Sequence, residues 1–178
     1  LIRLEKVGLV KNNVNRGYSV CRISHKEAEE IYDLREYIDC LSVRKVIKNI
    51  TDEKIKKIKE IIKDMELCVK NNEIEKYVEL DKYMHEVLNI LSNNERLIGI
   101  MQNLNYQISM LLKTSVKLPG RGINKSFKEH VSIFNAILNK DSKEAEKRVK
   151  KHIVNTKISV LNYFDNLNFK SKSWKREQ

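Results

Sequence analysis

Hydrophobic residues recur along most of the chain at the three- and four-residue spacing of amphipathic helices. Ser24 followed by Glu27 forms a capping-box pattern, and Thr51 and Asp141 stand at two further helix starts. The pattern predicts helices over about residues 24–50, 51–70, 73–91, 95–116, 123–139 and 141–168. Six amphipathic helices joined by short links predict an all-α fold, an antiparallel bundle.

Three features refine this division of the chain. In the first helix, the residues expected to face the core are Ile31, Leu34, Ile38, Leu41 and Val46. Residues 117–122 contain the single proline and two of the five glycines, so this segment is the clearest predicted loop. Residues 169–178 form a basic tail that we expect to fray.

The segment before residue 24 has a different pattern. Residues 8–10 and 18–20 are short and apolar, and they flank a polar tip that ends in Arg16-Gly17, which predicts a small β-hairpin. Residues 1–6 are typical of the last turn of a helix. Because the chain does not begin with Met and opens in such a turn, we expect it to be a piece of a longer protein.

Composition limits the class of protein. The 178 residues are 41% hydrophobic, which is enough for one domain with a real core. The formal net charge of +11 favours a polyanionic partner, although the lysines are spread along every predicted helix. Three cysteines without a CxxC pair indicate reduced thiols. No signal peptide and no apolar run of roughly 18–20 residues is present, so we expect a cytoplasmic protein without a membrane span.

Four residues on three predicted helices have the chemistry of a metal site. Asp81 and His85 lie one turn apart on the apolar face of their helix, where a carboxylate is costly unless it is neutralised. His130 and His152 lie on the inward faces of the last two helices. Three imidazoles and one carboxylate suit Zn²⁺, Ni²⁺, Mn²⁺ or Fe²⁺. Each residue alone has a simpler explanation, a hydrogen-bonded core histidine or a paired acid, and His25 is expected to be exposed.

Arg35 is a second candidate, because its stem lies among apolar residues of the first helix. A buried guanidinium binds a carboxylate with two parallel hydrogen bonds. The alternative is an ion pair with Asp39, four residues later in the same helix, and from the residues alone this alternative is favoured. No glycine-rich phosphate loop and no serine or cysteine nucleophile motif is present.

These residues together resemble a known family, the FCD domain. This domain is the effector-binding half of GntR-superfamily transcription regulators of the FadR-type branch. The resemblance rests on Asp81-x-x-x-His85 with Leu88, Ser92 and Asn94, on Glu129-His130 with Ala136, Asp141 and Ala145, on His152, and on Ile31 to Arg35 with Asp39. Residues 1–20 resemble the end of the recognition helix and the wing of a winged helix-turn-helix, with Arg16 and Gly17 as the DNA-contacting positions. Met84 departs from the family, where an aromatic residue is common.

The resemblance implies a function as well as a fold. It implies a helical domain over residues 24–168 that holds a divalent metal, most commonly zinc, through Asp81, His85, His130 and His152. Arg35 would bind the effector, a small organic or sugar acid, and the effector would alter DNA binding by a homodimer. The chain would then not be an enzyme.

Two alternatives remain open from the sequence. The first is a metal-dependent hydrolase, which needs a general base near the metal. Glu129 is the only clear candidate, and it is expected to face outward. The second is a metal-free bundle that binds its partners through lysines.

Overall fold

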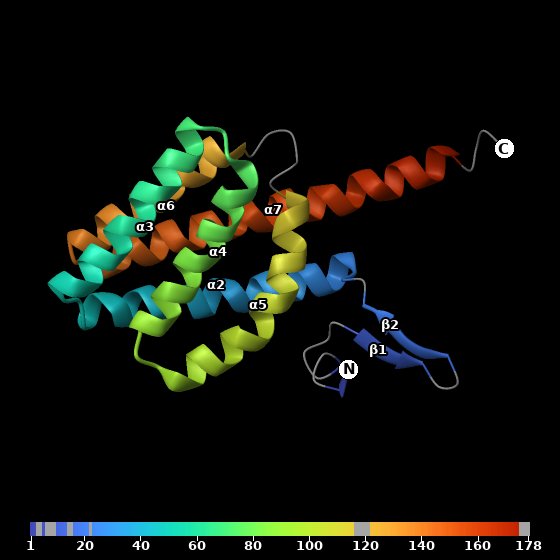
Figure 1. Cartoon of the computed structure of the whole chain (residues 1–178), viewed down its shortest axis with the longest axis horizontal. Helices are drawn as coiled ribbons and strands as arrows, with labels where there is room; N and C mark the ends of the chain where they lie inside the picture. Colours follow the sequence, from blue (N-terminus) through green and yellow to red (C-terminus); the bar gives the residue numbers. More distant parts are fainter. Residues whose placement is uncertain (3–4, 6–9, 14–15, 22, 116–121, 175–178) are drawn as a thin grey trace.

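The computed structural model describes residues 1–2, 5, 10–13, 16–21, 23–115 and 122–174 (Figure 1). Within these residues it forms a two-stranded hairpin followed by helices, and the all-α bundle predicted from the sequence is confirmed. The elements are β1 (Val10–Asn13), β2 (Gly17–Val20), α2 (His25–Lys48), α3 (Asp52–Lys70), α4 (Ile74–Leu91), α5 (Glu95–Ser115), α6 (Gly122–Leu138) and α7 (Ser142–Trp174).

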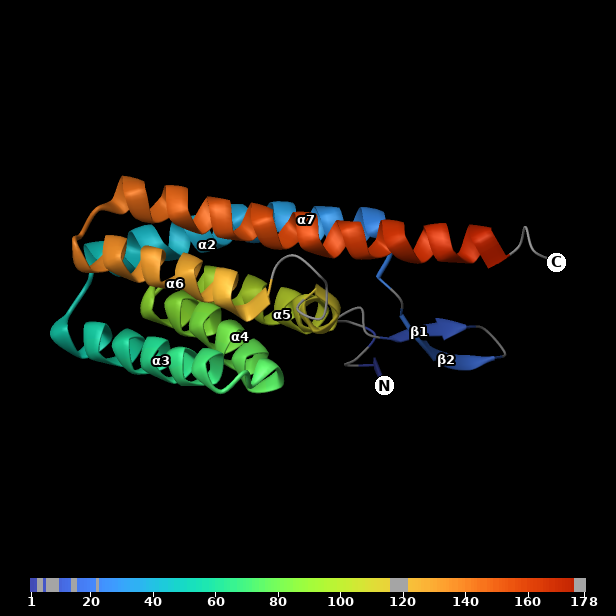
Figure 2. The ribbon, with the colours of Figure 1, turned by 90° about the horizontal axis from the view of Figure 1, so that it is seen from above.

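The helices pack in two layers. Figure 2 shows α2 and α7 side by side along one side of the bundle, with α6, α4 and α3 on the other side. α5 crosses one end and contacts α2, α4 and α7. This packing brings the middle turns of α2, α4, α6 and α7 toward one another.

Local sequence sets where these helices begin and end. The Ser24 hydroxyl accepts a hydrogen bond from the Glu27 amide at 3.2 Å, while the Glu27 carboxylate accepts one from the Ser24 amide at 2.7 Å, so the predicted capping box is present. The side chains of Thr51 and Asp141 cap α3 and α7 by accepting hydrogen bonds from the backbone amides of Lys54 and Glu144. Asn72, which follows α3, has a φ of 55°, a left-handed conformation that asparagine tolerates at a helix end.

The loop at the tip of the hairpin is shorter than the sequence suggested. Lys11, Asn12 and Asn13 belong to β1, and Asn13 pairs with Gly17. Gly17 has a φ of +75°, which glycine adopts without the cost that a side chain adds. Of the helical turn predicted over residues 1–6, the structure describes the Glu5 amide donating to the Leu1 carbonyl at 2.9 Å, and residues 3–4 and 6 lie outside the described part.

The core side of α2 differs from the predicted stripe. Leu34 is 55% exposed, whereas Arg35 and Asp39 are buried. The stripe was assigned from apolar residues alone, and the buried face of α2 carries charged residues where it meets α4 and α7. Of the other predicted residues, Ile31 and Val46 are buried, and Ile38 and Leu41 are partly buried against the core.

The last helix is longer than expected. α7 continues to Trp174, past residue 168, where the predicted helical domain ends. The predicted loop over residues 117–122 lies outside the described residues except for Gly122, which begins α6. Within the described residues, none of the helices has a stretch both apolar and long enough to span a lipid bilayer.

Candidate metal centre

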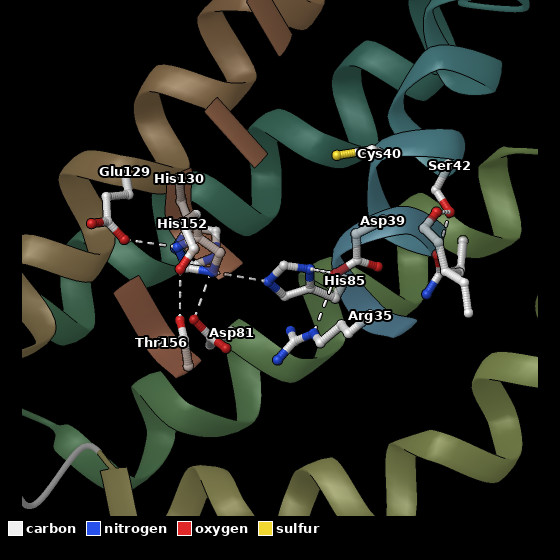
Figure 3. A network of polar contacts seen from close by, with 12 residues as sticks. Arg35, Asp39, Cys40, Ser42, Asp81, His85, Glu129, His130, His152 and Thr156 are labelled. Atoms are coloured by element: carbon white, nitrogen blue, oxygen red, sulfur yellow. Dashed lines mark hydrogen bonds and ion pairs between the residues drawn. The ribbon is translucent and has the colours of Figure 1, made fainter. Parts of the chain in front are cut away.

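The structure brings the four predicted metal-site residues together at the centre of the bundle (Figure 3). Asp81 and His85 come from α4, His130 from α6 and His152 from α7. One candidate ligand atom of each lies within 4.8 Å of all the others, and all four residues are buried. The Nε2 atoms of His85 and His152 are 3.2 Å apart, and Nε2 of His130 is 3.4 Å from Oδ1 of Asp81.

These separations fit a single cation. With metal–nitrogen and metal–oxygen bonds of about 2.0–2.1 Å, two ligand atoms of a tetrahedron lie about 3.3–3.4 Å apart. The two measured separations, 3.2 and 3.4 Å, bracket that value. The donor set of three ring nitrogens and one carboxylate oxygen is one that Zn²⁺ accepts, so the residues present fit the metal.

The other nitrogen of each imidazole has its own acceptor. Nδ1 of His85 lies 3.0 Å from Oδ2 of Asp39, and Nδ1 of His152 lies 2.9 Å from Oε2 of Glu129. Nδ1 of His130 lies 3.0 Å from the carbonyl oxygen of Ser126. A proton on Nδ1 that is donated to such an acceptor leaves Nε2 with a free lone pair. All three Nε2 atoms are thereby directed as ligands toward the same point.

Asp81 is also held in place. The hydroxyl of Ser126, one turn before His130 in α6, donates to Oδ1 of Asp81 at 3.3 Å. The phenol of Tyr77, one turn before Asp81 in α4, lies 3.3 Å from Nδ1 of His130. Both contacts join α4 to α6 at the level of the cluster, so the two helices fix each other's ligands.

Arg35 lies beside this centre. Its side chain is almost completely buried, its Nε donates to Oδ2 of Asp39 at 3.2 Å, and its Nη1 has no hydrogen-bond partner among the described residues. Figure 3 shows the guanidinium directed toward the side of the cluster where Asp81 lies. Burial opposes its charge, but Asp39, Tyr32 and Asp81 outweigh burial and raise the pKa of Arg35 above its ordinary value. The ion pair with Asp39 that the sequence favoured is therefore present.

The surroundings of Asp39 favour its charged form. Burial alone would raise the pKa of its carboxyl, but the hydrogen bonds and charges of His85 and Arg35 outweigh burial and hold that pKa below its ordinary value. A buried carboxylate with two donors on one oxygen is the result.

Sequence reasoning missed the positions of two acids. Glu129 was expected to face outward, which is wrong: its side chain is 13% exposed, and it accepts hydrogen bonds from His152 and, at 2.6 Å, from Asn155. Asp39 was considered only as a partner of Arg35. Its position four residues after Arg35 was visible in the sequence, but its contact with His85 depends on how α2 packs against α4.

The predicted DNA-contacting residues lie far from the metal centre in the chain and on the surface. Arg16 and Gly17 are exposed at the tip of the hairpin, where the Arg16 amide donates to the Asn13 carbonyl at 2.9 Å. His25 is half-buried at the start of α2, and its Nε2 lies 3.7 Å from Asp165. It has no part in the cluster.

Comparison with known proteins identifies the family. The FCD domain family matches residues 30–155, most of the chain and all of the cluster. An uncharacterized HTH-type transcriptional regulator of Bacillus subtilis, YdhC, is 26% identical over 150 residues, which are 84% of this chain and 66% of that protein. The chain thus spans slightly less than two thirds of that relative's length.

Solved structures share the fold. Escherichia coli McbR/YncC superposes with a TM-score of 0.80 at 14% identity, covering 90% of this chain and 80% of that one. The Zn²⁺-bound FCD domain of TM0439, described as a putative transcriptional regulator, superposes with a TM-score of 0.63 at 20% identity, covering 83% and 98%. The named relatives are regulators of transcription, not enzymes. The chain belongs to the FCD domain family of GntR-type transcriptional regulators, as the resemblance in its sequence indicated.

Proposed function

We propose that this chain is the sensing part of a transcriptional regulator, in which a divalent metal and Arg35 together bind a small organic or sugar acid. Asp81, His85, His130 and His152 would hold the metal, and zinc fits their donor set best. The observation that carries the proposal is the convergence of three Nε2 atoms and one carboxylate oxygen, with the Nδ1 atom of each imidazole held by an acceptor.

Arg35 supports the acidic nature of the effector. Its guanidinium is buried beside the cluster, and its Nη1 remains available for a further acceptor. A metal ion held by four protein ligands accepts an additional oxygen ligand when its coordination expands. A carboxylate placed between the two would bind the metal through one oxygen and Arg35 through the other.

Binding of such an acid would act on DNA by linkage, not by catalysis. A ligand shifts a conformational equilibrium only by the difference in its affinity for the two states, typically a coupling of about 1–3 kcal/mol. Residues 1–20 would be the end of the recognition helix and the wing of a DNA-binding domain, with Arg16 and Gly17 as DNA-contacting residues, and residues 24–168 would be the sensing domain. A homodimer would present paired wings to two half-sites in the cytoplasm.

A direct experiment is native mass spectrometry of the untagged chain, followed by calorimetric titration of the zinc-loaded protein with a panel of one- to six-carbon carboxylates. We expect one zinc ion per chain and binding of at least one acid, which Arg35→Met weakens at least tenfold. A chain that binds no divalent metal at micromolar concentration would refute the proposal.

The hydrolase alternative now has a candidate base within reach of the centre, because Glu129 faces inward. However, both oxygens of Glu129 are engaged, one by His152 and the other by Asn155, which makes it a support for His152. The same panel, offered as esters, tests this alternative by turnover.

A further inference from the structure

We infer that Asp39 couples the metal centre to the anion-binding Arg35, because one oxygen of its carboxylate is shared between them. Oδ2 of Asp39 accepts from Nε of Arg35 at 3.2 Å and lies 3.0 Å from Nδ1 of His85 (Figure 3). Asp39 is thus a positioning residue that acts on the metal through His85 and on the effector through Arg35. This inference rests on the proposed function and describes how metal binding and acid binding would regulate each other.

The sharing matters because all three groups are buried. Arg35, Asp39 and His85 are each 5% exposed or less, so water does not replace a lost hydrogen bond. Within the described residues, Nη1 of Arg35 has no hydrogen-bond partner, so Asp39 is the acceptor that holds its guanidinium. An incoming carboxylate that binds Nη1 would therefore compete with Asp39 for the charge of the same guanidinium.

A metal ion changes this competition. When Nε2 of an imidazole binds a cation, the ring loses electron density and its Nδ1–H becomes a stronger donor. Asp39 is then held more tightly by His85, and Arg35 becomes more available to an external carboxylate. By reciprocity, an acid that takes Arg35 leaves Asp39 entirely to His85 and strengthens metal binding. The predicted coupling is positive, and Asp39 carries it.

Glu129 provides a matched control within the same site. It supports His152 as Asp39 supports His85, at 2.9 Å from Nδ1. Its other oxygen, however, accepts from the neutral amide of Asn155 at 2.6 Å. Loss of the Glu129 charge should therefore weaken the metal site without releasing an anion-binding group.

The test compares Asp39→Asn with Glu129→Gln in two titrations. In the first, zinc affinity is measured by competition with a chelating indicator, and we expect both variants to bind zinc about 10–100-fold more weakly than the wild-type chain. In the second, metal-free protein is titrated with sodium acetate, the smallest two-carbon carboxylate, at constant ionic strength. We expect Asp39→Asn to bind acetate at least fivefold more tightly than the wild-type chain, and Glu129→Gln to bind it equally.

The outcomes separate this inference from the proposed function. A wild-type chain that binds no zinc refutes the proposed function itself. If zinc binds but Asp39→Asn binds acetate no more tightly than the wild-type chain does, the coupling role of Asp39 is refuted while the metal site remains. A purely structural role for Asp39 would predict that Asp39→Asn binds acetate no more tightly than the wild-type chain does, because a damaged site loses affinity for zinc and for acetate alike.

A measurement on the wild-type chain covers the case in which Asp39→Asn does not fold. Arg35 is the buried arginine of the described residues, so its Nε–H signal is the slowly exchanging one in a nitrogen-15 spectrum. We expect addition of zinc alone to speed exchange of that proton by at least threefold, as Asp39 moves toward His85. An unchanged exchange rate in zinc-saturated protein would overturn the inference.

Discussion

Removal of the proposed metal should lower the free energy of unfolding substantially, because of how the candidate ligands are buried and arranged. Without a cation, Asp81 remains 93% buried opposite three imidazoles, with Nε2 atoms directed at one point and at one another. Two of the ligand separations, 3.2 and 3.4 Å, match those around a bound zinc ion, so these ligands need little rearrangement when the metal binds. Binding to the folded state alone stabilises it by mass action.

The expected size follows from that linkage. At a free zinc concentration one hundred times the dissociation constant, the stabilisation is about 2.7 kcal/mol. For a chain of this length, each kcal/mol shifts the melting temperature by about 2–4 °C. A chelator should therefore lower the melting temperature by roughly 5–11 °C, and readdition of zinc should restore it.

The assay is thermal unfolding of the untagged protein with chelator, then with zinc, for the wild-type chain and three variants. His152→Gln and Asp81→Asn should abolish the zinc-dependent shift. His25→Gln is the control, since His25 lies at the far end of α2 against Asp165 and should leave the shift intact. A wild-type chain that melts at the same temperature with and without zinc, or a His152→Gln variant that responds like the wild-type chain, would refute the reasoning.

Four further results are expected. Zinc affinity should fall as the pH drops below about 6.5, because ligating imidazoles must be unprotonated; a flat titration from pH 7.5 to 5.5 would contradict this. The lowered pKa of Asp39 contributes stability that is present above a pH of about 3.9 and is lost as the pH falls further. In the presence of chelator, urea unfolding should therefore show that the wild-type chain loses more stability between pH 5 and 2.5 than Asp39→Asn does. Ile137→Ala, in the core, should cost about 2–5 kcal/mol in the same assay, whereas Ile158→Ala, 51% exposed, should change stability by less than about 0.5 kcal/mol. Burial raises the pKa of the Cys40 thiol to about 11, so at pH 8 a thiol reagent should modify it far more slowly in folded than in urea-unfolded protein; equal rates would rule this out.

Sequence periodicity located the four cluster residues because each lies in phase with apolar neighbours on its own helix. Asp81 and His85 share the buried face of α4 with Tyr77, Met84 and Leu88, so the helical repeat alone shows that they point inward. The repeat does not show which helices meet, and the convergence became visible only in the packing of α4, α6 and α7.

The same periodicity argument did not find the buried residues that support the candidate ligands. On α2 the buried face carries Arg35 and Asp39, so apolar periodicity pointed instead to Leu34, which is exposed. Glu129 precedes His130 by one residue, and on an isolated helix two adjacent positions cannot both face one partner. Glu129 is partly buried because α7 packs close to that edge of α6 and supplies His152 and Asn155.

The charges around the cluster explain why its acidic residues and Arg35 are found next to the candidate metal ligands. With neutral imidazoles, the charged groups at the cluster are the carboxylates of Asp81, Asp39 and Glu129 and the guanidinium of Arg35, which leaves two negative charges. Unbalanced charge is costly in a low-dielectric interior, and a single divalent cation neutralises it. The proposed acidic effector would bring one more negative charge into a balanced site, and the buried guanidinium beside the cluster, that of Arg35, is already bound to Asp39. In the proposed function, the affinity for the acid would therefore depend on how firmly Asp39 holds Arg35, which would place the control of the response on α2, outside the four candidate metal ligands.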